Sequence, residues 1–193
     1  WERPVYFAVT CSEDSRIGLN DYLTMEGLAF KVTPVKSNLV YQRVDEPIMR
    51  KQLFEEPEGF SYDYAPGFKF RGLDDPTIFF DENHSRLAQN YRNSFMRLAL
   101  HYMSVEKDNN KVVETLDMME EKLPRSVIPI DYRLLHDIGN IYLSSGGVQQ
   151  YQEIADEIEV IALAQLERNP MDFNNRYSPY FILRDIYENA EEW

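Results

Sequence analysis

The sequence is poor in cysteine, glycine and long apolar runs, and each shortage excludes a class of protein. Cys11 is the one cysteine among 193 residues, which excludes an internal disulfide and a zinc site of clustered cysteines. Eight glycines and ten prolines are too few for a collagen-like or low-complexity chain. No apolar run approaches the roughly 20 residues that a membrane helix needs, so we expect no direct membrane insertion by these residues.

The motifs of common enzymes are also missing. His84, His101 and His136 lie too far apart in sequence for a helical zinc motif. The sequence has no glycine-rich phosphate loop and no Gly-x-Ser-x-Gly turn, and no histidine near Cys11 in sequence suggests itself as a base. We therefore expect no catalytic residue and no cofactor in this chain.

Basic residues are outnumbered, because 33 Asp and Glu face 20 Lys and Arg and give a net charge of -13. Such a chain repels the phosphate backbone, so nucleic acid is not an expected partner. What the chain does contain is apolar and aromatic side chains, at 44% and 13% of its residues, which is enough for a packed core.

Residues 1–56 are predicted to form a small α/β unit. Apolar patterning indicates strands over residues 5–9 and 30–35, with a short helix over 21–29 between them, as in a βαβ unit with a parallel crossover. A further helix is expected over residues 47–54, because Asp45 and Glu46 precede Pro47 at a favourable helix start, and Pro57 then ends it.

Residues 57–83 read as a connector rich in aromatic residues, which either cover a junction in the core or offer a surface for a sugar or a partner. The aromatic side chains are Phe60, Tyr62, Tyr64, Phe68, Phe70, Phe79 and Phe80.

Residues 84–193 carry helical periodicity. Leu87, Tyr91, Phe95, Leu98, Tyr102 and Val105 recur at spacings of four and three residues, as on one face of a helix. Four more helices are expected over residues 111–123, 131–143, 148–168 and 178–189. The predicted fold class is α+β and mainly α: a small α/β unit followed by an antiparallel helical array.

One internal similarity appears in this array. Ala99-x-x-Tyr102 recurs as Gly139-x-x-Tyr142, and a tight polar turn and an amphipathic helix follow each. This pattern resembles the first helix of tetratricopeptide repeats, in which a small residue lets two helices approach. The array is therefore expected to hold two degenerate tetratricopeptide-like repeats, separated by an insertion over residues 125–130, and a final capping helix.

Such repeats bind partners through the polar face of their first helices. The resemblance implies that the first helices of this chain do the same. Arginine offers a planar fork to carboxylates and asparagine pairs with peptide groups, so this face suits a protein or peptide partner, although a polar helix face can also be merely solvated. The predicted binding stripe consists of Arg86, Asn90, Asn93, Arg97, His101, Arg133, His136 and Asn140.

An acidic cluster allows a second interpretation. Asp74, Asp75, Asp81 and Glu82 could bind a metal or a glycan or act in catalysis, although the spacing of an EF-hand loop is missing. Alternatively, these acids cap the following helix, because carboxylates complement the positive end of its dipole.

Two regions resemble one family of bacterial polytopic membrane proteins, in the part that follows the last membrane span. The first comprises residues 3–10 (Arg-Pro-Val-Tyr-Phe-Ala-Val-Thr), 16–23, 26–31 and 34–36. The second comprises residues 72–76 (Gly-Leu-Asp-Asp-Pro), 81–83, 90–95 and 97–99. That family, long of unknown function, is similar to GT-C-type glycosyltransferases and to a transmembrane protein O-mannosyltransferase, and its members commonly end in a tetratricopeptide-like tail.

The resemblance implies that this chain is the extracytoplasmic, periplasmic part of an inner-membrane protein. The chain begins at Trp1, close to its first predicted strand, as expected of a domain within a longer protein. The catalytic acid of GT-C enzymes lies in an early loop between membrane helices, so no catalytic residue is transferred to this chain. The expected role is noncatalytic, with the membrane portion of the parent and a protein or peptide as partners.

Overall fold

A computed structural model describes residues 3–37, 43–57, 67–172 and 177–191. Contacts divide the chain into two compact units, residues 1–128 and 129–193, and each is described by itself. The boundaries predicted after residues 56 and 83 both fall inside the first unit.

A four-stranded sheet opens the first unit. Its strands are β1 (Tyr6–Ala8), β2 (Leu23–Glu26), β3 (Ala29–Val32) and β4 (Arg43–Val44), in the order β1-β3-β2-β4. β3 pairs antiparallel with both β1 and β2, whereas β2 and β4 are parallel. Short 3-10 turns, η1 (Asp14–Arg16) and η2 (Asn20–Tyr22), connect β1 to β2.

The helix predicted over residues 21–29 is wrong, and so is the βαβ unit. These residues form β2 and a hairpin turn into β3, in which Glu26 pairs with Ala29. Gly27 at the first turn position has φ 66°, the conformation that a two-residue type II′ hairpin requires. Leu23 and Met25 are buried and alternate with half-buried neighbours, so the true hydrophobic period is two.

The helix predicted over residues 47–54 is confirmed as α1 (Glu46–Phe54). The Asp45 carboxylate caps it by accepting a hydrogen bond from the Ile48 amide at 3.3 Å, and Pro47 occupies the first turn. Arg50 of α1 donates two hydrogen bonds, of 2.7 and 3.1 Å, to the Glu114 carboxylate. Glu114 belongs to α3 (Asn109–Lys122), so this ion pair joins two helices of the first unit.

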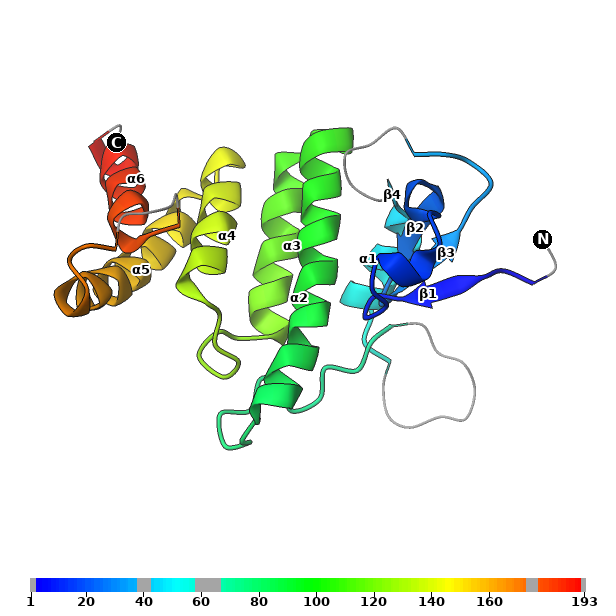
Figure 1. The fold of residues 1–193 in the computed structure, drawn as a ribbon, viewed down its shortest axis with the longest axis horizontal. Helices are drawn as coiled ribbons and strands as arrows, with labels where there is room; N and C mark the ends of the chain where they lie inside the picture. The colour runs from blue at the N-terminus through cyan, green and yellow to red at the C-terminus, as the bar shows by residue number, and fades with distance from the viewer. Residues whose placement is uncertain (1–2, 38–42, 58–66, 173–176, 192–193) are drawn as a thin grey trace. The chain divides into compact units, whose positions relative to one another are not determined.

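The long helix α2 (Glu82–His101) runs alongside α3 (Asn109–Lys122) in the opposite direction, and a π-helical turn, η3 (Tyr102–Glu106), ends α2 (Figure 1). α2 and α3 pack against each other, and Val112, Leu116 and Met119 of α3 are all buried. The Asp108 carboxylate caps α3 through the Lys111 amide. The other side of α2 faces α1 and the sheet.

Part of the aromatic connector is buried as predicted. Phe68 and Phe70 each lie 5.2 Å from the Tyr91 ring, and Phe70 lies 6.0 Å from Phe95, so these rings attach the connector to α2. Phe79 instead is 89% exposed. Phe60, Tyr62 and Tyr64 lie outside the described residues.

The second unit consists of α4 (Tyr132–Ser144), α5 (Val148–Arg168) and α6 (Pro179–Glu191), close to the predicted helices. Gly139 lies where α4 approaches α5: a Cβ atom there would be 3.1 Å from Ile154 and 3.4 Å from Tyr151. Ala99 of α2 and Tyr102, the first residue of η3, are buried like Gly139 and Tyr142 of α4. The mainly helical α+β class is confirmed, while the assignment to tetratricopeptide-like repeats stays a prediction.

Candidate functional site

The first unit contains a groove of about 340 Å³ between the loop after β1, the sheet and α2. Three residues of the predicted binding stripe, Asn90, Asn93 and Arg97, line its α2 wall. Arg16 and Glu13 line it from the loop after β1. The fold therefore places the middle of the α2 stripe in a groove. A second arginine, Arg16, which is distant in sequence, lines the same groove.

Apolar side chains complete this groove. Met25 of β2 and Phe30 of β3 are buried beneath it, because both alternate onto the sheet face that packs toward α2. Met96 and Leu100 continue the lining along α2. The lining is therefore mixed, with polar groups from α2 and the loop after β1 beside apolar side chains.

Arg16 is the least expected member of the site. Its side chain is only 6% exposed, and its guanidinium carbon lies 4.7 Å from the centre of the Phe30 ring. Nη2 donates to the Cys11 carbonyl oxygen at 3.0 Å, and Nη1 to Oδ1 of Asn20 at 3.4 Å. Nε is buried without a hydrogen-bond partner. Burying a cation beside neutral hydrogen-bond partners costs free energy, and the contact with the Phe30 ring offsets part of that cost.

The backbone after Arg16 is strained. Ile17 has φ 54° and ψ 41°, the left-handed conformation that β-branched residues rarely adopt, and its side chain is 82% exposed. Gly18 continues the turn with φ 73°. Because the Ile17 side chain is exposed, no apolar burial compensates for the strained backbone of this turn. Such uncompensated strain is common beside functional sites.

Replacing Ile17 by glycine should therefore stabilise the protein. Glycine adopts the left-handed region without a Cβ clash, and we expect the free energy of unfolding to rise by about 1 kcal/mol. Urea unfolding of Ile17→Gly and wild type measures the difference. A loss of stability in Ile17→Gly would contradict the assignment of strain to this turn.

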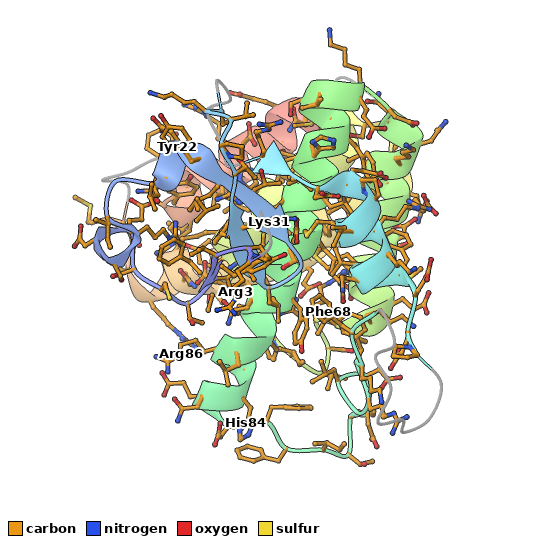
Figure 2. All side chains as sticks on the ribbon, turned by 90° about the vertical axis from the view of Figure 1, so that its right-hand side faces the viewer. Arg3, Tyr22, Lys31, Phe68, His84 and Arg86 are labelled. Atoms are coloured by element: carbon orange, nitrogen blue, oxygen red, sulfur yellow. The ribbon has the colours of Figure 1, made fainter. Side chains whose placement is uncertain are left out.

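Two other stripe residues of α2 lie outside the groove lining. Arg86 lies near the start of the helix, close to His84, and donates to the Asn83 side chain at 3.3 Å (Figure 2). His101, near the other end, lies 3.6 Å from the Glu106 carboxylate.

The remaining stripe residues belong to the second unit, where α6 supplies an unforeseen partner. Nε2 of His136 and Oδ2 of Asp185 are 2.7 Å apart, and the Asn140 amide lies 3.4 Å from the same carboxylate oxygen. Arg133 instead lies over the Tyr132 ring, 5.4 Å from its centre. Helical spacing placed His136 and Asn140 on one face, but it could not place Asp185 against them.

The acidic cluster is engaged in local structure. Asp81 caps α2 by accepting from the His84 amide at 2.8 Å, which lowers the pKa of its carboxyl, so the capping interpretation is confirmed at this residue. Asp75 accepts from the Thr77 amide and hydroxyl. Asp74 and Glu82 are exposed. Within the described residues, no group of three or more His, Cys, Asp or Glu side chains could hold a metal ion.

Sequence reasoning missed Glu13 and Arg16 as site residues. Residues 16–23 contributed to the family resemblance, but nothing in the pattern indicated that the Arg16 side chain turns inward. The one local signal is Gly18 after a run of polar residues, which marks a tight turn without giving its direction.

Comparison with known proteins gives one match. Residues 1–48 match the family model described as TMEM260-associated domain 2, which relates this quarter of the chain to a domain associated with a membrane protein. No match was found among curated proteins or among solved structures. None of the helices in the described part of the chain is both long and apolar enough to cross a bilayer.

Proposed function

We propose that this chain is a noncatalytic interaction and positioning domain that binds a protein or peptide partner. The observation that carries the proposal is the placement of Asn90, Asn93 and Arg97 in the wall of a groove that apolar side chains also line. Asparagine amides both donate to and accept from peptide groups, and arginine pairs with carboxylates. These side chains bind and orient, and none of them supplies a nucleophile.

The proposed setting is the membrane-embedded portion of a larger protein, at its extracytoplasmic, periplasmic face. The match of residues 1–48 to a domain associated with a membrane protein supports this setting. The matched residues include β1, β2, β3 and Arg16, so they supply one side of the groove. A glycosyltransferase activity of that larger protein is a further proposal, which rests on the resemblance of residues 3–10 and 72–99 alone.

The proposed helical architecture is a pair of tetratricopeptide-like repeats, α2 with α3 and α4 with α5, followed by α6 as a cap. Two observations support it. Ala99 near the end of α2 and Tyr102 directly after it are fully buried, and in α4 the absence of a side chain at Gly139 admits Ile154 and Tyr151 of α5. Both first helices thus use a small residue at the contact with a neighbouring helix.

A capture experiment tests the proposed function. The chain, immobilised, is exposed to detergent-solubilised membranes of its source cells, and bound proteins are identified. We expect the double variant Asn90→Ala/Arg97→Ala to lose most of the captured partner while its melting temperature stays close to that of wild type.

The matched control replaces one asparagine and one arginine away from the groove. Asn109 and Arg184 are exposed on α3 and α6, so Asn109→Ala/Arg184→Ala should capture the partner as wild type does. Equal capture by both double variants would show that the groove is not the binding surface, and the proposal would then be rejected.

A further inference from the structure

We infer that the groove beside α2 binds the carboxylate of an acidic side chain in a peptide segment, with Arg16 as the principal donor. This inference rests on the proposed function and specifies the ligand chemistry of the same site.

The first argument is the missing counterion of Arg16. The side chain lines the groove, is more than nine-tenths buried, and donates only to a backbone carbonyl and an amide oxygen. Among the described residues no carboxylate forms an ion pair with it, and its buried Nε has no hydrogen-bond partner. A carboxylate in the groove would provide the compensating charge for this buried cation.

The second argument is the local charge. The described lining of the groove carries more positive than negative charge, although the net charge of the chain is -13. Arg97 adds a second cation to the groove, and Glu13, the one acid among its described lining residues, is exposed. The groove is therefore a locally basic site on an acidic protein, which favours an anionic ligand and selects against a basic one.

The third argument concerns what surrounds the anion. A volume of about 340 Å³ lies in the range of ligand pockets and exceeds the needs of a lone carboxylate. Asn90 and Asn93 add side-chain amides that match peptide groups, while Met96 and Leu100 of α2 offer apolar contact. A peptide with an acidic residue between apolar residues satisfies all three features at once.

The strained turn at Ile17 agrees with this assignment. It follows Arg16 directly and ends η1, the turn that directs the Arg16 side chain inward. Strain that persists beside a buried, incompletely paired cation is expected where a site is organised before its ligand binds.

The test uses the intact chain and a matched pair of peptides, acetyl-Leu-Glu-Leu-amide and acetyl-Leu-Gln-Leu-amide, with binding followed by NMR. We expect the acidic peptide to shift the Nε–Hε signal of Arg16 at millimolar concentration, and to bind about tenfold more tightly than the glutamine peptide. Sodium acetate is the third probe. If acetate binds as tightly as the acidic peptide, the site recognises a small anion and the peptide assignment is wrong.

Variants separate a role in binding from a role in folding. Arg16→Lys keeps the charge but loses the planar fork, and Arg97→Gln removes the other cation without touching the loop after β1; each should weaken the acidic peptide about tenfold. Arg184→Gln changes an exposed side chain of α6 away from the groove and should leave binding unchanged.

The outcomes distinguish this inference from the proposed function. Equal binding of the acidic and glutamine peptides, or no shift at Arg16, overturns the carboxylate assignment even if Asn90→Ala/Arg97→Ala still loses its captured partner. If that double variant also captures its partner normally, the proposed function fails as well.

Discussion

Replacing Arg92 by leucine should lower the free energy of unfolding by about 3 to 5 kcal/mol, the largest single loss expected in this protein. Arg92 is 1% exposed, and its Nη2 donates to the carbonyl oxygens of Leu123 and Ile128. Leucine would fill much of the space but would leave both buried carbonyl groups without a donor. The loss is therefore larger than that of a surface arginine.

Two features make Arg92 a structural cation. Burial lowers the pKa of its guanidinium to about 10, which still leaves it protonated at neutral pH, and the nearby Glu120 carboxylate opposes this shift. Its two partners lie at the ends of the segment after α3: Leu123 follows the last turn of that helix, and Ile128 ends the first unit. One side chain thus holds α2 against a loop more than 30 residues away in sequence.

Urea unfolding of Arg92→Leu and Arg92→Lys measures this effect. Lysine keeps the charge but lacks the fork, so its loss should lie between those of wild type and the leucine variant. Arg86→Leu is the control on the same helix, because Arg86 is exposed and its substitution should change the free energy of unfolding by less than about 0.5 kcal/mol. Similar losses for Arg86→Leu and Arg92→Leu would contradict the argument from burial.

The arginines of α2 illustrate what the sequence could predict. Helical periodicity correctly placed Phe95, Leu98 and Tyr102 in the core. The same periodicity wrongly placed Leu87 and Val105 inside, although they are 55% and 48% exposed, and it gave no sign that Arg92 is buried. α2 packs against α3 on one side and against α1 and the sheet on another, so its buried surface is wider than the single stripe that an apolar pattern marks.

The sequence predicted the α2 side of the candidate site but not the side that the loop after β1 supplies. Asn90, Asn93 and Arg97 follow from spacing along one helix, because residues three and four positions apart share a face. Arg16 faces them across more than 70 residues of sequence, and tertiary packing alone brings it there. The β2–β3 hairpin was missed for a different reason: the apolar pattern at Leu23 and Met25 is short, and Gly27 was placed inside a helix and not in a two-residue turn.

Gly27 gives the second large effect, since Gly27→Ala should lower the free energy of unfolding by about 2 to 4 kcal/mol. The residue has φ 66°, and a Cβ atom there would lie 2.8 Å from Cζ of Phe68, a ring that itself packs on Tyr91. The Gly27 carbonyl oxygen also accepts a hydrogen bond of 3.2 Å from Ser94 of α2. An added methyl group would strain the turn and push the hairpin away from this helix.

Gly18→Ala is the matched control, because it separates backbone strain from packing. Gly18 has a similar φ of 73°, but nothing lies within 4 Å of the position that a Cβ atom would take. Its substitution should cost about 1 kcal/mol, from the left-handed conformation alone. Urea unfolding of both variants measures the two losses, and equal losses would show that the contact with Phe68 contributes nothing.

The same variant links the fold to the site. Met25 of β2 and Phe30 of β3 pair with each other across the hairpin and line the groove. Both lie within three residues of Gly27. A hairpin displaced from α2 changes the spacing between Arg16 and Arg97, so Gly27→Ala should weaken the acidic peptide under conditions in which the protein is still folded. Gly18→Ala, which leaves the contact between hairpin and helix intact, should affect binding less than Gly27→Ala does. If Gly27→Ala bound the peptide as wild type does, the hairpin would stabilise the fold without setting the width of the groove.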